Sequence, residues 1–167
     1  MSEEYFPIVN PDGEILGRTT RSECHNGESF ILHPVVHLHV FNSKGELYLQ
    51  KRSLNKDIQA GKWDTSVGGH MDFGESVIDA LRREVREELG ILDFEPQFIK
   101  SYVFKSSVEK ELVNVFKTVY DGEINFDRVE IDEGKFWSMD EIKQILEDKV
   151  KAKIFTENFR DEFSILL

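Results

Sequence analysis

Three glutamates in this chain stand at a spacing that could hold a divalent metal ion. Glu84, Glu87 and Glu88 lie at positions i, i+3 and i+4, so a helix would carry them on one face. Like charges at this spacing repel each other, and the helix macrodipole disfavours negative charge near a C-terminal end. A cation relieves both costs, and carboxylate oxygens are ligands that Mg²⁺ and Mn²⁺ prefer. The spacing therefore favours a metal site whose remaining coordination positions bind phosphate.

The helix that would position these glutamates has two recognisable ends. Ser76, with Asp79 three residues later, is typical of a capping box, and Gly90 suits a helix C-terminus. At about 100° per residue the apolar side chains form one stripe, which predicts burial against a sheet. This stripe contains Ile78, Leu81, Val85 and Leu89.

The stretch from Gly69 to Ile91 reads G-x5-E-x7-R-E-V-x-E-E-x-G-I without a gap. An isolated E-x-x-E-E pattern is more often a solvated acidic face, offset here by the arginines at 82, 83 and 86. The glycine loop and the Arg-Glu pair favour metal chemistry instead. They are the signature of the Nudix hydrolases, and the sequence resembles that superfamily. The resemblance implies an α/β/α sandwich with a mixed β-sheet and a loop-helix-loop metal site, the Nudix box, at residues 69–91.

The resemblance also implies roles for individual residues of the box. In the family, the last three glutamates and a backbone carbonyl at the start of the loop hold Mg²⁺ or Mn²⁺. The corresponding ligands here are Glu84, Glu87, Glu88 and the carbonyl of Gly68 or Gly69. The resemblance further implies that Glu75 and Arg83 pair with each other or with other box residues and fix the loop.

Composition restricts the kind of protein that carries this box. A chain of 167 residues with 40% hydrophobic content suits a single domain spanning residues 1–167. The net charge of −11 speaks against binding long nucleic acid, yet metal ions can bridge an acidic protein to a small anionic substrate. The single cysteine, Cys24, fits a reducing compartment, and we expect a cytoplasmic protein without a membrane segment. A monomer and a homodimer both remain open.

Apolar alternation and turn residues predict the elements around the box. We expect a hairpin at residues 6–17, strands at 34–41, 46–52, 63–67, 96–105, 112–120 and 135–137, and a helix from Met139. A final amphipathic segment carries Phe155, Phe159 and Phe163. His37 and His39 alternate with core residues and are typical of ordinary strand histidines.

Residues 41–52 and 61–70 resemble isopentenyl diphosphate isomerase, and the likeness extends over most of residues 9–140. In the isomerases a catalytic cysteine lies two residues before the histidine that is His70 here. This chain has Gly68 at that position, and glycine can neither donate nor accept the proton that alkene isomerisation requires. The remaining interpretation is a metal-dependent hydrolase that cleaves a diphosphate bond in a small substrate, such as a nucleoside diphosphate linked to another moiety. An isomerase-like enzyme and a catalytically silent ligand-binding domain are the alternatives.

The same resemblance suggests the remaining site residues. The general base that activates water could be Glu84 or Glu88 inside the box, or Glu111 or Glu133 outside it. Basic residues in the segment before the box contact diphosphate in the isomerases, which makes Arg52 and Lys56 candidates for substrate binding. A second metal site, for Zn²⁺ or Mn²⁺, would use the isomerase-like set of His25, His33, His70, Glu109 and Glu111.

Overall fold

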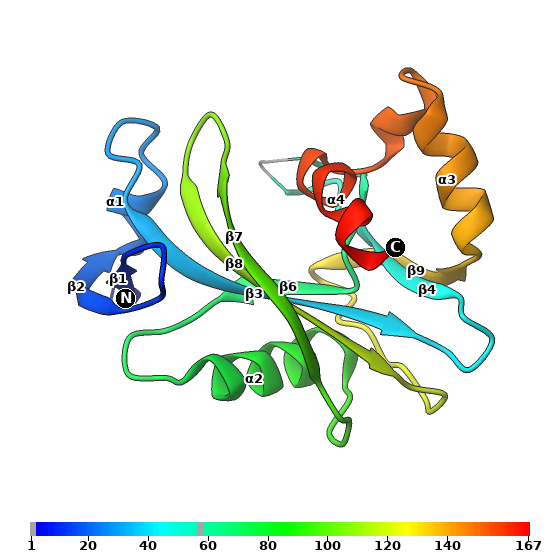
Figure 1. The fold of residues 1–167 in the computed structure, drawn as a ribbon, viewed down its shortest axis with the longest axis horizontal. Coiled ribbons are helices and arrows are strands. Elements are labelled where there is room, and N and C mark those ends of the chain that lie inside the picture. The colour runs from blue at the N-terminus through cyan, green and yellow to red at the C-terminus, as the bar shows by residue number, and fades with distance from the viewer. Residues whose placement is uncertain (1–2, 57–58) are drawn as a thin grey trace.

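The computed structural model describes residues 3–56 and 59–167 of the chain, and Figure 1 shows how its elements are arranged. The chain begins with an antiparallel hairpin of β1 (Tyr5–Val9) and β2 (Ile15–Thr20), which forms a two-stranded sheet of its own. A short helix, α1 (Arg21–Cys24), follows. The predicted hairpin is therefore confirmed, and both of its strands lie at one end of the molecule (Figure 1).

The central sheet has seven strands and mixes parallel and antiparallel pairs. Its main path runs in the order β5-β4-β3-β8-β7, while β6 pairs with β3 and β9 pairs with β4. Only the β3–β8 pair is parallel among the described pairs. The strands are β3 (Leu32–Phe41), β4 (Leu47–Arg52), β5 (Trp63–Asp64), β6 (Val67–His70), β7 (Gln97–Lys105), β8 (Lys110–Val119) and β9 (Ile131–Trp137).

Helix α2 (Val77–Leu89) covers one face of this sheet and carries the acidic residues of the box. The Ser76 side chain accepts a hydrogen bond from the Asp79 backbone N–H at 3.1 Å, and Gly90 ends the helix in the left-handed region at φ 67°. Both predicted ends are confirmed. The predicted stripe is wrong at Ile78, which is 40% exposed, because a first-turn side chain leans toward the N-terminal end of its helix. Ala80 is buried in the stripe instead.

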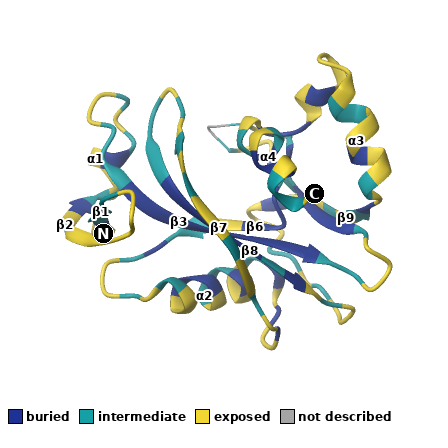
Figure 2. Cartoon of the chain, in the orientation of Figure 1, coloured by how far each residue is buried: buried dark blue, intermediate teal, exposed yellow. Residues whose placement is uncertain are grey.

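The C-terminal helices pack against the other side of the sheet and around its β4–β9 end (Figure 1). They are α3 (Met139–Glu147), η1 (Lys151–Ile154), α4 (Glu157–Glu162) and η2 (Phe163–Leu166). Phe155, Phe159 and Phe163 join a second core with residues of β4, β5 and β9, as their spacing predicted. Figure 2 shows the buried positions along the strands between the two helical layers. These layers form the expected α/β/α architecture, and no helix among the described residues is long and apolar enough to cross a membrane.

The segment before the box is two strands rather than the single strand expected at 63–67. β5 pairs with β4, whereas β6 pairs with β3. Ser66 lies at the change of partner, where its hydroxyl accepts from the Val40 N–H at 2.9 Å and donates to the Tyr48 carbonyl. This hydroxyl satisfies backbone groups at the point where the pairing of the chain changes.

The last strand is longer than the sequence indicated. β9 begins at Ile131 rather than at Lys135 and pairs with β4 along its length. The polar segment 132–134, which lies outside the strand expected at 135–137, is therefore part of β9, because pairing with β4 overrides its turn-like composition. Glu133 opposes Lys51 in this pair and is exposed.

Candidate active site

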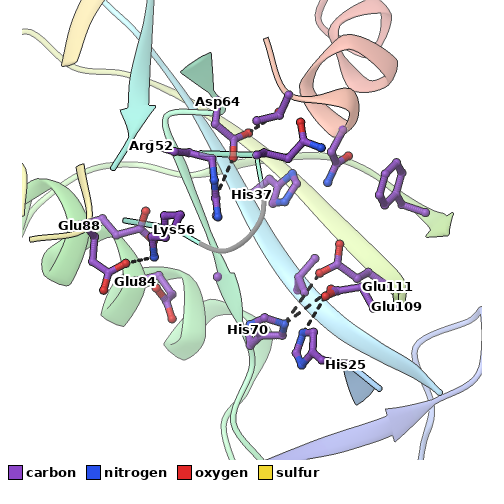
Figure 3. A pocket seen from close by; sticks show the side chains of 18 of the residues that line it. His25, His37, Arg52, Lys56, Asp64, His70, Glu84, Glu88, Glu109 and Glu111 are labelled. Carbon is purple, nitrogen blue, oxygen red and sulfur yellow. Dashed lines mark hydrogen bonds and ion pairs between the residues drawn. The ribbon is translucent and has the colours of Figure 1, made fainter. Parts of the chain in front are cut away.

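A cavity of about 900 Å³ lies where the box, the strand ends and the N-terminal hairpin meet. Polar and charged side chains from α2, β4, β5, β6 and β8 converge on it, as Figure 3 shows. The residues that carry its chemistry are Arg52, Lys56, Asp64, Gly69, His70, Glu84, Glu87, Glu88, Glu109 and Glu111. The fold therefore brings most of the predicted site residues to one cavity.

Arg83 ties the box loop to the helix. Its guanidinium donates to both carboxylate oxygens of Glu75, at 2.8 and 2.9 Å. It also donates to the His70 carbonyl at 3.0 Å and to Glu84 at 2.7 Å. The fork geometry of an arginine suits this multiple role. The expected pairing of Glu75 with Arg83 is present, and it fixes the start of the loop beside the acidic face.

The acidic face is electrostatically strained in the protein alone. Burial raises the pKa of Glu84 above its ordinary value, although Arg83 and a hydrogen bond with Glu88 oppose this. Burial and the neighbouring Glu84 charge raise the pKa of Glu88 well above its ordinary value. A neutral amide, that of Gln50, donates to Glu88 at 2.8 Å. Two neighbouring carboxylates whose ionisation is opposed by burial are suited to a cation from outside.

Gly69 lets the backbone of β6 approach this acidic face closely. A Cβ atom at this position would lie 2.2 Å from the Glu84 carboxylate carbon, which no side chain could accept. The close approach places a backbone segment next to the glutamates, where a carbonyl can act as a further oxygen ligand. The role proposed by the resemblance for the carbonyl at Gly69 is compatible with this geometry.

A second group of donors lies on the hairpin side of the cavity. His25, His33, His70 and Glu109 each offer one ligand atom, and these atoms all lie within 4.8 Å of one another. Nε2 of His25 is 2.7 Å from the Glu109 carboxylate. Nε2 of His70 is 4.0 Å from Glu109 and 3.9 Å from Glu111. The isomerase-like set therefore converges, as Figure 3 shows for His25, His70 and the two glutamates.

Backbone carbonyl groups fix the orientation of two histidine rings of this group. Nδ1 of His25 lies 2.8 Å from the Arg21 carbonyl, and Nδ1 of His33 lies 2.8 Å from the Ile31 carbonyl. Among the described residues, Nε2 of His33 and Nε2 of His70 are buried without a hydrogen-bond partner. Burial and the neighbouring histidine charges lower the pKa of His70 to about 3. Burial opposes a charge on His33, but Cys24 and Glu109 raise its pKa to about 10, so metal binding would displace a proton from His33. Such support by carbonyls is typical of metal-binding histidines.

The other predicted residues divide between the cavity and the surface. Arg52 lines the cavity with a guanidinium nitrogen 3.4 Å from the Asp64 carboxylate. Lys56 also lines it and pairs with Glu130. Glu111 lines the cavity, and burial together with Glu109 raises its pKa well above the ordinary value. Glu133 is exposed on β9 and is not among the residues that line the cavity.

Sequence reasoning missed three contributors to the cavity and its surroundings. Gln50 and Asp64 line it, and His37 lines it while bonding to Glu162, which is fully buried on α4. Burial opposes a charge on His37, but Glu162 raises the pKa of His37 to about 9. The only sequence signal for this group was strand alternation, which places His37 and His39 on the same face of the sheet. Their shared partner lies more than 120 residues away in sequence, at a distance that no local pattern spans.

Comparison with known proteins identifies the family. The family model described as "NUDIX domain" matches residues 31–159. The chain belongs to the Nudix family. The match includes the box, the strand β8 and most of the C-terminal helical segment, whereas Phe6, Arg21 and His25, which also line the cavity, lie before it.

Two curated relatives represent the two chemistries that the sequence left open. The chain is 27% identical to an isopentenyl-diphosphate Delta-isomerase of Serratia proteamaculans, over 89% of this chain and 83% of the relative. It is 36% identical to an uncharacterized Nudix hydrolase of Pseudomonas aeruginosa, over 80% of this chain and 78% of the relative. A crystal structure from Deinococcus radiodurans is similar with a TM-score of 0.75 and 23% identity, over 95% and 96% of the two chains. That structure supports the fold alone.

Proposed function

We propose that this Nudix protein is a metal-dependent hydrolase that cleaves a diphosphate bond in a small phosphorylated substrate. The observation that supports it most is the acidic face of α2. There, burial raises the pKa values of Glu84 and Glu88, the Glu84 charge adds to the effect on Glu88, and Gly69 brings the backbone of β6 close to Glu84. A hard divalent cation such as Mg²⁺ or Mn²⁺ suits this donor set.

Glu84, Glu87, Glu88 and the Gly69 carbonyl would hold this cation. When bound, it neutralises the diphosphate and lowers the pKa of a water molecule. Arg83 keeps Glu84 in place and fixes the loop through Glu75. Arg52 and Lys56, both at the cavity wall, would contact substrate phosphate; the guanidinium fork of Arg52 matches phosphate oxygens.

A carboxylate at the cavity wall would take the proton from the attacking water. Glu84, Glu88 and Glu111 all line the cavity and have raised pKa values, so each is a better proton acceptor than an ordinary carboxylate. The exposed position of Glu133 outside the cavity leaves it without a part in the proposal. A substrate with a nucleoside-sized group beside its diphosphate suits the cavity, since about 900 Å³ is ample for a ligand of that size.

An isomerase-like activity is the second candidate, and the His25–His33–His70–Glu109 group favours it. We propose that Zn²⁺ or Mn²⁺ occupies this group, with Glu111 as a further ligand, because buried imidazole nitrogens and carboxylates suit these ions. Gly68 opposes the isomerase candidate, because it offers no proton-transferring side chain between this group and the box.

A substrate screen tests the proposal. The purified protein is incubated with nucleoside diphosphate sugars, dinucleoside polyphosphates, nucleotides and prenyl diphosphates, each with Mg²⁺ and with Mn²⁺, in ¹⁸O-labelled water. We expect hydrolysis of a diphosphate bond, with the label in one phosphate product showing which phosphorus the water attacks. Double-bond migration in a prenyl diphosphate without label uptake would favour the isomerase candidate, and no turnover in any reaction would contradict both.

A further inference from the structure

Glu162 is a fully buried carboxylate surrounded by hydrogen-bond donors. It accepts from His37 Nδ1 at 2.8 Å, from His39 Nε2 and from the Tyr102 hydroxyl at 2.5 Å. Although burial opposes ionisation, the His37 charge and the histidine hydrogen bonds lower the pKa of Glu162. A buried carboxylate needs a nearby cation, because leaving a buried charge unpaired is strongly destabilising.

His37 is better placed than His39 to be that cation. His39 is fully buried, and among the described residues its Nδ1 atom has no hydrogen-bond partner. A second proton on His39 would therefore add a buried, unsatisfied donor. His37 is 8% exposed and lines the cavity, so a proton on its outer nitrogen can be satisfied there. His37 therefore carries the positive charge that balances Glu162, and its outer nitrogen lies on the cavity side of the ring.

The outer nitrogen of His37, Nε2, lies beside Gly68 of β6, which also lines the cavity. A Cβ atom built at Gly68 would lie 3.2 Å from His37 Cδ2 and 3.4 Å from His37 Nε2. The neighbouring Gly69 faces Glu84 in the same way, and successive residues of a strand point to opposite faces. His37 and the acidic face therefore lie on the two sides of one short glycine segment. Figure 3 shows His37 between the Arg52–Asp64 pair and the glutamates Glu109 and Glu111.

The other cations at this wall have their counter-charges within the cavity. Arg52 lies 3.4 Å from Asp64, Lys56 pairs with Glu130, and both acidic residues line the cavity. The counter-charge of His37 is Glu162, which is fully buried and is not among the lining residues. The carboxylate that contacts His37 thus lies behind its ring, while Glu111 and Asp64, which line the cavity, act on His37 through their charge alone.

We propose that His37 binds a phosphoryl oxygen of the substrate through its Nε2–H, while Glu162 positions the ring through Nδ1. This assignment rests on the proposed function, because it presumes a diphosphate ligand in the cavity. It adds a cationic contact on the side of Gly68–Gly69 opposite to the acidic helix, so that the diphosphate would be held from both faces. Hydrogen bonds to charged groups contribute about 1.5–3 kcal/mol, which corresponds to about tenfold or more in affinity.

Three substitutions distinguish phosphate binding by His37 from its structural contact with Glu162. In His37→Asn the side-chain amide can replace Nδ1 toward Glu162, but nothing replaces the outer nitrogen. In His39→Gln the amide can replace Nε2 toward the same Glu162, and His39 does not line the cavity. Tyr102→Phe removes the third donor to Glu162; Tyr102 is not a lining residue, although its hydroxyl also donates to the lining residue Asn158 at 2.8 Å. The last two variants are therefore matched controls that disturb the same buried group.

The test is calorimetric titration with inorganic pyrophosphate at saturating Mg²⁺. We expect His37→Asn to weaken pyrophosphate binding at least about tenfold, and His39→Gln and Tyr102→Phe to stay within about twofold of the wild type. Equal weakening in all three variants would assign His37 a structural role and overturn the proposal. So would unchanged binding in His37→Asn, or no binding by the wild type.

A second variant keeps the test decisive if His37→Asn does not fold. His37→Gln keeps an amide at the outer position and loses the contact with Glu162, so it should melt at a lower temperature yet bind more tightly than His37→Ala. Equal binding by the two would overturn the proposal. Because pyrophosphate binding requires no turnover, His37-dependent binding without hydrolysis would contradict the proposed function alone. Hydrolysis with unchanged binding in the His37 variants would contradict this inference alone.

Discussion

Two acidic groups in this protein, one fully buried and one half-buried, differ in what neutralises their charge. Glu162 is surrounded by His37, His39 and Tyr102, and its pKa is lowered despite burial. Glu84 and Glu88 face each other, and burial raises both of their pKa values. The fold thus supplies the positive charge for the first group through His37. In the second group Arg83 contacts Glu84, but Glu88 receives only the neutral amide of Gln50, and a cation from solution can supply the rest. Buried charge that the protein itself does not balance is a typical mark of a functional site.

The largest effect that tests this contrast is expected from Glu162→Gln. The substitution removes the negative charge and places an amide against two histidines, so the His37 charge is left buried without its partner. We expect a loss of about 3–5 kcal/mol in the free energy of unfolding, measured by urea denaturation. A loss below about 1 kcal/mol would show that this carboxylate does not stabilise the fold as the contacts indicate.

The same chemical change at Glu88 should act in the opposite sense. Glu88→Gln removes a carboxylate whose ionisation is opposed by burial and by the Glu84 charge, so the metal-free protein should melt no lower than the wild type. Turnover of a diphosphate substrate should fall at least about a hundredfold, because a metal ligand and a candidate base are lost.

Glu133→Gln is the matched control for this variant, since Glu133 is an exposed glutamate outside the cavity. It should change turnover less than about twofold, in keeping with the small effects of most surface substitutions. Similar turnover in Glu88→Gln and the wild type would contradict the functional role proposed for Glu84 and Glu88.

The stabilisation by Glu162 should depend on pH in a defined window. Burial opposes the charge on His37, but Glu162 raises its pKa from 6.5 to about 9, with smaller contributions from Glu111 and Asp64. This stabilisation is complete below 6.5 and is lost as the pH rises through about 9. The pKa of Glu162 is lowered from 4.5, so its contribution is complete above 4.5 and is lost at more acid pH.

The difference in unfolding free energy between the wild type and Glu162→Gln should therefore be largest between pH 4.5 and 6.5. It should shrink as the pH approaches about 9. Urea denaturation of both proteins across this range measures it. A difference that does not change with pH would mean that His37 is neutral in the folded protein.

The smallest effect concerns the helix that carries the acidic face. Ser76 caps α2 by accepting from the Asp79 N–H at 3.1 Å, and Ser76→Ala should cost about 1 kcal/mol of stability. Metal affinity should change less than about threefold, because Arg83 and Glu75 hold the loop independently of the cap. A tenfold loss of metal affinity would show that the cap, rather than the arginine, positions the glutamates.

The sequence predicted those features that depend on neighbours along the chain. The ends of α2 followed from Ser76 and Gly90, and the pairing of Glu75 with Arg83 followed from the box. The predicted burial of Ile78 was wrong, because helical periodicity alone does not show where the helix contacts the sheet.

What escaped prediction depends on strand pairing and long-range packing. The division of residues 63–70 into β5 and β6 is decided by which strand each segment pairs with. The Glu162 group joins three distant elements, and a buried glutamate near the C-terminus looks like any other helical acid in sequence. The contrast between the two acidic groups could therefore be seen only once the chain was folded.

Calorimetric titration of the metal-free protein with Mg²⁺ and Mn²⁺ tests the central claim most directly. The wild type and Glu133→Gln should bind the ions, and Glu88→Gln should lose most of this binding. His70→Asn, which removes one donor of the histidine group, should keep the binding to the box. No uptake of either ion by the wild type, with or without candidate diphosphates, or equal uptake by Glu88→Gln, would contradict the account.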